Sequence, residues 1–303
     1  MNTDKRKGLK ESYVYILVLV LFFYFIESST SVYAYSGINA SVYSEDIKES
    51  YLYGIKTITL VVTDSKLQQN TGVNELVLCT FDNKHKKVKL TSILRNTCLK
   101  TPDGGLLTID KLSSERSLRY INDTLNNSFN LRLMEYAKVD LIKLVNVVGS
   151  VKLIEIDIKK EEVPYMKEEG IVSMGVHYLT PNQALTFTRI PDGNIGGRER
   201  SDRVRMVLAK CYQVVKNQHT KEYLPLIYLL IPCIESNLDS GDMVQIGMNV
   251  LTTTKAGLEE QRVPFDNHMR NECIKEVNYI MYEEEYTKER LYNNIYEDIC
   301  IGK

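Results

Sequence analysis

The chain has 303 residues, enough for one large domain or two small ones with a substantial core. Its composition, 44% hydrophobic and 25% charged, is that of a globular protein and excludes a disordered or fibrous one. Lysine and arginine (38) nearly balance aspartate and glutamate (39), so the chain lacks the overall positive charge of a nucleic-acid-binding protein. Binding of anions therefore depends on local clusters of arginine.

The N-terminus begins with a basic stretch, and an uncharged apolar stretch then runs from Tyr13 to Ile26. A helix of that length spans about 21 Å, less than the roughly 30 Å hydrocarbon core of a bilayer. This pattern indicates export, either with a signal peptide cleaved after Ala34 or with an uncleaved signal anchor in the cell membrane. The expected segments are a cytoplasmic basic tail at 1–12, the signal peptide or anchor at 13–34 and a polar spacer at 35–54.

Export makes the cysteines candidates for disulfide bonds, because the compartment outside the membrane is oxidising. Their scattered spacing favours buried free thiols or one or two bridges, and the sequence does not determine the pairing. No CxxC motif or His/Cys cluster at metal spacing occurs, which argues against a zinc site. The cysteines are Cys79, Cys98, Cys211, Cys233, Cys273 and Cys300.

From Ile55 onward the chain alternates strand and helix patterns, which predicts a single α/β domain. Predicted strands lie at 56–62, 75–81, 88–93 and 151–158, the second and third forming a hairpin. Predicted helices lie at 114–129, 141–148, 181–188, 199–218, 239–251 and 283–299. Asp140 is the predicted N-cap of the second helix and Gly149 its C-terminal stop, while Thr180, Pro181 and Gln183 form a capping box for the third.

Charged residues gather at the ends of these elements. Asp64 follows the first buried strand, where open α/β sheets bind ligands, and Glu75 begins the next strand. Two arginines lie three residues apart on the 199–218 helix, so that they share one face, and two others follow a strand and the capped helix. The four are Arg95, Arg189, Arg200 and Arg203.

These arginines would repel one another in a shared cleft unless a polyanion lay between them. Guanidinium groups bind phosphate bidentately, and Mg²⁺ prefers one or two carboxylates together with phosphate oxygens. The residues are compatible with a Mg²⁺–pyrophosphate site. The alternative is that the arginines are solvated or paired with acids such as Glu199 and Asp202, and that Asp64 is a turn residue.

Four blocks of the sequence, in this order, resemble the LytR-CpsA-Psr family: 60–66 (LVVTDSK) with 71–97, then 122–151, 179–190 and 196–210. The resemblance implies a membrane-anchored extracytoplasmic protein, mainly of Gram-positive bacteria. Such proteins transfer a glycopolymer, of teichoic acid or capsule type, from a polyprenyl-pyrophosphate carrier to peptidoglycan. It also implies a central β-sheet flanked by helices, a hydrophobic pocket for the lipid tail and a catalytic core at 55–215. Residues 216–303, which the matched blocks do not reach, are expected to form a C-terminal helical and strand part of the same domain.

The resemblance assigns roles to individual residues. Asp64 and Glu75 correspond to the acidic residues of a Mg²⁺ site. The catalytic and pyrophosphate-binding arginines correspond to Arg95, Arg189, Arg200 and Arg203, and Lys66 and Arg198 are further cations beside them.

The sequence departs from the family pattern at several of these positions. The family's R-S-D-T is Val73-Asn74-Glu75-Leu76, so one arginine is lost and an aspartate becomes a glutamate. Each charge-assisted contact to phosphate contributes about 1.5–3 kcal/mol, so missing arginines weaken the site unless Lys66 and Arg198 compensate. Further replacements are Asn96 for Asp, Lys66 for Arg, Pro191 for a second Arg, Gly197 for Asp and Val204 for Gln, while Asp192 lies where it can replace an acid.

Two functions follow from this reading. The first is a Mg²⁺-dependent glycopolymer–peptidoglycan phosphotransferase that works at the membrane on lipid-linked substrate. The second is a divergent, non-catalytic protein that binds polyprenyl pyrophosphate or the cell wall. A nearly neutral exported chain argues against a nucleic acid as partner.

Overall fold

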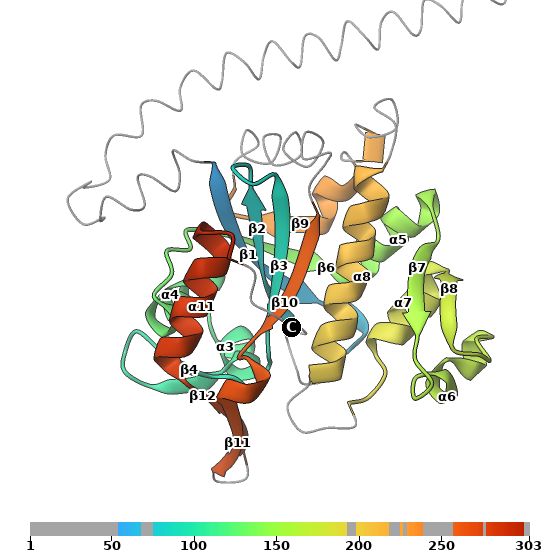
Figure 1. Ribbon diagram of the computed structural model, residues 1–303. Helices are drawn as coiled ribbons and strands as arrows, with labels where there is room; N and C mark the ends of the chain where they lie inside the picture. Colours follow the sequence, from blue (N-terminus) through green and yellow to red (C-terminus); the bar gives the residue numbers. More distant parts are fainter. Residues whose placement is uncertain are drawn as a thin grey trace, which may run out of the picture.

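The computed structural model describes residues 54–67, 75–192, 198–217, 225–226, 229–238, 257–274 and 277–299 (Figure 1). The segments expected at 1–12 and 13–34, nearly all of the spacer and the helix predicted at 239–251 lie outside these ranges. Within the described ranges, no helix combines the length and apolar character needed to cross a membrane. The signal segment therefore stays a prediction.

A six-stranded sheet in the order β10-β3-β2-β1-β6-β9 forms the centre of the molecule (Figure 1). β1, β2 and β3 pair antiparallel, whereas β1 and β6 are parallel, with Thr63 opposite Asp140. The carboxyl ends of β1 and β6 therefore meet at one end of the sheet. The strands are β1 (Ile55–Thr63), β2 (Glu75–Asp82), β3 (Lys87–Ile93), β6 (Glu135–Asp140), β9 (Ile234–Ser236) and β10 (Leu258–Val263).

Helices cover both faces of the sheet (Figure 1). Val61 and Val62, adjacent on β1, point into opposite cores because side chains alternate along a strand. One core lies under α5 (Leu141–Val151), α7 (Pro181–Thr188) and α8 (Arg198–Lys216), and the other under α3 (Ile109–Glu115), α4 (Leu118–Phe129) and α11 (Glu284–Tyr296). The predicted α/β class, with a central sheet flanked by helices, is confirmed.

Smaller elements surround this sheet. Three two-stranded hairpins and the short helix α6 lie beside it, and the residues after 216 add β9 and β10 to its two edges. The hairpins are β4 (Cys98–Lys100) with β5 (Leu106–Thr108), β7 (Ile154–Ile158) with β8 (Gly175–Leu179), and β11 (Met269–Ile274) with β12 (Val277–Tyr282). The helix α6 is Val163–Met166. The short 3-10 helices are η3 (Ser65–Leu67), η4 (Lys167–Glu169), η5 (Ile231–Cys233) and η6 (Asp266–His268).

Two expectations about helices were wrong. The predicted helix at 114–129 is instead α3 and α4, because Ser117 leaves the helical conformation and its hydroxyl caps α4 by accepting from the Tyr120 N–H. Gly149 does not end α5 but lies within it. A Cβ at that position would lie 2.6 Å from Pro181 Cγ, so the glycine allows α5 and α7 to pack closely.

Other local predictions are confirmed. Asp140 caps α5 by accepting from the Ile142 and Lys143 N–H groups, and Thr180 and Gln183 form the predicted capping box. The cysteines within the described part of the chain are free thiols, namely Cys79, Cys98, Cys211, Cys233 and Cys273, and Cys300 lies outside it.

Candidate functional site

Asp64 lies directly after β1 and is bound by Arg189, the residue that follows α7. Arg189 Nε donates to Asp64 Oδ2 at 2.7 Å, and Nη2 donates to Oδ1 at 2.9 Å. The Lys66 backbone N–H also donates to Oδ1, at 3.1 Å. The Asp64 residue is only 4% exposed, so its charge is neutralised by this bidentate pair rather than by water.

Glu75 begins β2 and is completely buried. Its Oε2 accepts a hydrogen bond from the Ser201 hydroxyl on α8, whereas its Oε1 has no hydrogen-bond partner among the described residues. Burial raises the pKa of Glu75 to about 8, although the Ser201 hydrogen bond and the charges of Arg200 and Arg95 act in the opposite direction. A buried carboxyl with an unpaired oxygen is costly, and such atoms mark places where a ligand completes the pairing.

Arg200 and Arg95 lie beside Glu75. The pKa of Arg200 is lowered by burial and by the like charge of Arg95, while the acids Glu75, Asp192 and Asp64 oppose that shift. Arg95 is oriented by Asp110, whose Oδ1 accepts from Nη2 at 2.5 Å and from Nε at 3.1 Å. Two mutually repelling cations and two carboxyl groups therefore share one end of the sheet.

Arg203 binds the segment that follows α7. Its Nη2 donates to the Ile190 carbonyl at 2.5 Å and lies 3.4 Å from Asp192 Oδ1, and its Nη1 lies 3.7 Å from Glu162. Asp192 Oδ1 also accepts from the Arg200 backbone N–H at 2.6 Å. Arg203 is 4% exposed and joins α8 to the segment after α7, so its role as a pyrophosphate ligand stays a prediction.

The two supplementary cations lie at the margin of this group. The Lys66 residue is exposed, on the turn after Asp64. Arg198 Nη1 lies 3.4 Å from Asp266, on η6. The alternative acid Asp202 pairs with Arg205 at 2.8 Å and with Arg262 at 2.5 Å. The structure thus brings Asp64, Glu75, Arg95, Arg189 and Arg200 together.

Sequence reasoning missed three residues of the site. Ser201 was not recognised as a partner of Glu75, although it lies between Arg200 and Arg203 in the matched block. Asp110 carried no signal, because its pairing with Arg95 depends on the packing of α3. Lys143 lines a cavity beside Asp64, and the helical pattern at 141–148 does not distinguish it from other helix residues.

Residues 22–294 match the LytR_cpsA_psr family. The chain belongs to the LytR-CpsA-Psr family. A comparison with curated proteins finds no match.

Solved structures of this family share the fold. A structure described as TagT bound to LI-WTA is 17% identical, covers 80% of this chain and 90% of its own, and superposes with a TM-score of 0.65. A structure of YwtF (TagT) with bound octaprenyl pyrophosphate lipid is also 17% identical, with 80% and 90% coverage and a TM-score of 0.61. B. subtilis TagV is 15% identical, with 82% and 99% coverage and a TM-score of 0.62. At these identities the likeness shows the LytR-CpsA-Psr fold and not the role of any side chain.

Proposed function

We propose that the protein transfers a glycopolymer from a polyprenyl-pyrophosphate carrier to peptidoglycan, outside the membrane and with Mg²⁺, by cleaving the pyrophosphate bond. Members of this family are wall glycopolymer transferases, and TagT binds LI-WTA and octaprenyl pyrophosphate in its solved structures. The observation that carries the proposal is the buried, half-paired Glu75 carboxyl beside Arg95 and Arg200.

Asp64 and Glu75 are the residues that would hold Mg²⁺. Both supply carboxylate oxygens, the ligands that Mg²⁺ prefers, and Glu75 Oε1 lacks a partner among the described residues. When bound there, Mg²⁺ would offset negative charge on the phosphate oxygens of the substrate.

Arg95 and Arg200 would bind the pyrophosphate. Their mutual repulsion in the free protein is relieved when a polyanion lies between them, which favours binding. The hydrogen bonds from Arg189 to Asp64 use Nε and Nη2, so Nη1 is the atom that would bind a phosphate oxygen. Positioned guanidinium groups also stabilise the charge that develops on the leaving phosphate.

A non-catalytic binding protein is the second candidate function. Pro191 and Val204 replace family residues, and Arg203 is engaged by a backbone carbonyl and two acids. In this alternative the site holds polyprenyl pyrophosphate but does not cleave it.

The test is Mg²⁺-dependent cleavage of a polyprenyl-pyrophosphate-linked saccharide by the full chain in detergent. We expect turnover that is lost in EDTA and in Arg95→Ala but retained in Arg205→Ala. Arg205 is the matched control because it is an arginine on α8 that pairs with Asp202 and Glu260, outside the proposed site. Binding of the substrate without cleavage by the unmodified protein would support the non-catalytic alternative.

A further inference from the structure

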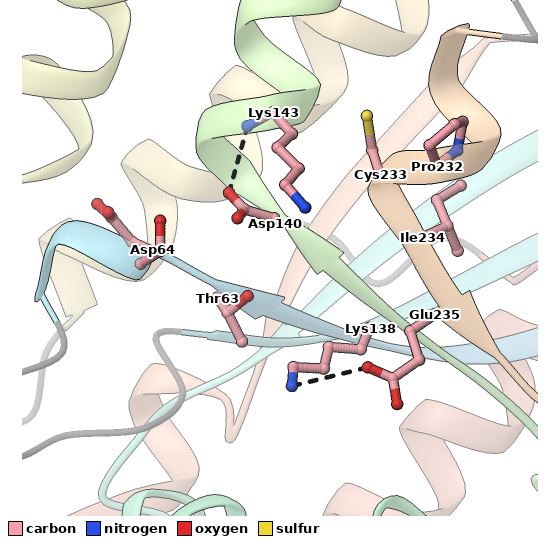
Figure 2. A pocket seen from close by; sticks show the side chains of 10 residues that line it. Thr63, Asp64, Lys138, Asp140, Lys143, Pro232, Cys233, Ile234 and Glu235 are labelled. Carbon is pink, nitrogen blue, oxygen red and sulfur yellow. Dashed lines mark hydrogen bonds and ion pairs between the residues drawn. The ribbon is translucent and has the colours of Figure 1, made fainter.

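A cavity of about 390 Å³ opens beside Asp64, above the ends of β1, β6 and β9 (Figure 2). Half of its lining is charged, and Pro232, Cys233 and Ile234 form one apolar wall. A polyprenyl chain in this cavity would remove those charges from water without pairing them, which is costly. The cavity therefore fits a polar molecule that carries hydroxyl groups.

The cavity and the arginines lie on opposite sides of Asp64 in the sheet order. Arg95 follows β3 and Arg200 lies beside Glu75 on β2, whereas the cavity extends from β1 across β6 to β9. Phosphoryl transfer places the attacking and leaving oxygens roughly in line, on opposite sides of the phosphorus. If the arginines hold the leaving phosphate, the attacking hydroxyl enters from the side of the cavity.

Lys143 supplies the clearest recognition group of the cavity. Figure 2 shows its side chain extending from the first turn of α5 into the space between Asp140 and Cys233. Its Nζ has no hydrogen bond or ion pair to any residue that the structure describes. Lys138 differs, because its Nζ lies 3.8 Å from Glu235. The other charged lining residues are mostly acids, namely Asp64, Asp140 and Glu235, so the ammonium group is a hydrogen-bond donor for an uncharged ligand that is rich in oxygen atoms.

We propose that this cavity is the acceptor subsite, which binds a sugar of the glycan strand with Lys143 donating hydrogen bonds to the oxygen atoms of that sugar. The proposal rests on the proposed transferase function. In the transfer, the acceptor hydroxyl oxygen forms a bond to the sugar-bearing phosphorus, and the bond from that phosphorus to the polyprenyl phosphate oxygen breaks. Polyprenyl phosphate leaves, and the hydroxyl proton passes to water in the open cavity.

The test compares Lys143→Ala and Lys143→Arg with Lys152→Ala, in the full chain. Lys152 is the matched control because it is an exposed lysine at the other end of the same helix. The acceptor is a soluble muramic-acid-containing glycan fragment. We expect Lys143→Ala to raise the KM for this fragment about 10-fold or more, the loss of one charge-assisted hydrogen bond. The kcat and the affinity for octaprenyl pyrophosphate stay unchanged, and Lys143→Arg restores most of the KM.

Two results would overturn the proposal. One is a KM for the fragment that is equal in Lys143→Ala and Lys152→Ala. The other is a change that affects only the affinity for the donor, which would place the donor's own saccharide in the cavity. If the unmodified protein transfers nothing, the proposed function fails, but calorimetric titration of the fragment still tests the subsite. Equal binding by the unmodified protein and Lys143→Glu would then exclude it.

Discussion

The two ends of strand β2 each carry a completely buried acid, and they differ in how fully that acid is paired. Asp82, at the last position, accepts from the His85 N–H at 2.9 Å and lies 2.8 Å from His85 Nδ1 and 2.9 Å from Lys89 Nζ. Glu75, at the first position, is paired through one oxygen only. The same strand therefore has one end that is electrostatically complete, the closed end at Asp82. The other, the open end at Glu75, is left available for a ligand.

The closed end contains its own cation. Asp82, His85 and Asp298 lie close enough together to resemble a metal site. Lys89 Nζ lies 2.9 Å from Asp82 and 3.0 Å from Asp298, and it donates to the Asn294 carbonyl at 2.6 Å. The ammonium group thus neutralises both carboxylates of this cluster, and we expect this end to serve stability rather than binding.

Removing that cation gives the largest expected effect. Lys89→Met leaves Asp82 and Asp298 without their shared partner, which should lower the free energy of unfolding by about 3–5 kcal/mol. Urea denaturation measures the loss, with Lys87→Met as the control. Lys87 also binds Asp298 but its side chain is 24% exposed, so its loss should cost less. Equal losses in the two variants would contradict the idea that the closed end depends on Lys89.

The open end should respond in activity instead of stability. Arg200→Ala removes a cation that is repelled by Arg95 and attracted by Glu75, Asp192 and Asp64. These effects oppose one another, so the melting temperature should change little. Turnover of the lipid-linked saccharide should fall by about 10²–10³-fold, as for other preorganised charges in active sites. Steady-state kinetics beside Arg205→Ala measures this effect. A fall of the same size in Arg205→Ala would show that the loss is not specific to the site.

The pKa of Glu75 makes the open end sensitive to pH. It is about 8 in the folded protein against an ordinary value of 4.5, because of burial. Between these values the folded protein keeps a proton that the unfolded chain releases, so the stability falls as the pH rises through this window. Glu75→Gln cannot titrate, so its stability relative to the unmodified protein should grow from about pH 5 to about pH 8. Melting curves in metal-free buffer measure this difference, and a constant difference would show that Glu75 is not held in its neutral form.

Lys66 should give the smallest effect. Its exposed charge is screened by salt, so Lys66→Ala should weaken octaprenyl pyrophosphate binding only a few-fold at low ionic strength. The difference should vanish at high salt. A loss as large as that of Arg200→Ala would mean that Lys66 replaces a missing arginine of the family.

The sequence was sufficient for features that depend on local pattern. The first strand, the hairpin and the capping box follow from alternation and capping chemistry, and they place Asp64 and Glu75 correctly. Contacts between segments that are distant in the sequence could not be predicted from local pattern. Arg200 and Arg203 share a helix face, yet Arg203 donates to the Ile190 carbonyl whereas Arg200 lies beside Glu75. The Lys89–Asp298 pair joins residues more than 200 positions apart, which no local pattern reveals.

The order of the strands also constrains how the chain folds during synthesis. Strands β9 and β10 come from the last third of the sequence, yet they cover the edges of β6 and β3. Until they are made, the hairpin and β6 present open edges that can pair with another chain. The domain therefore cannot finish folding before Val263 has emerged, and interrupted synthesis or proteolysis upstream of β10 yields fragments prone to aggregation.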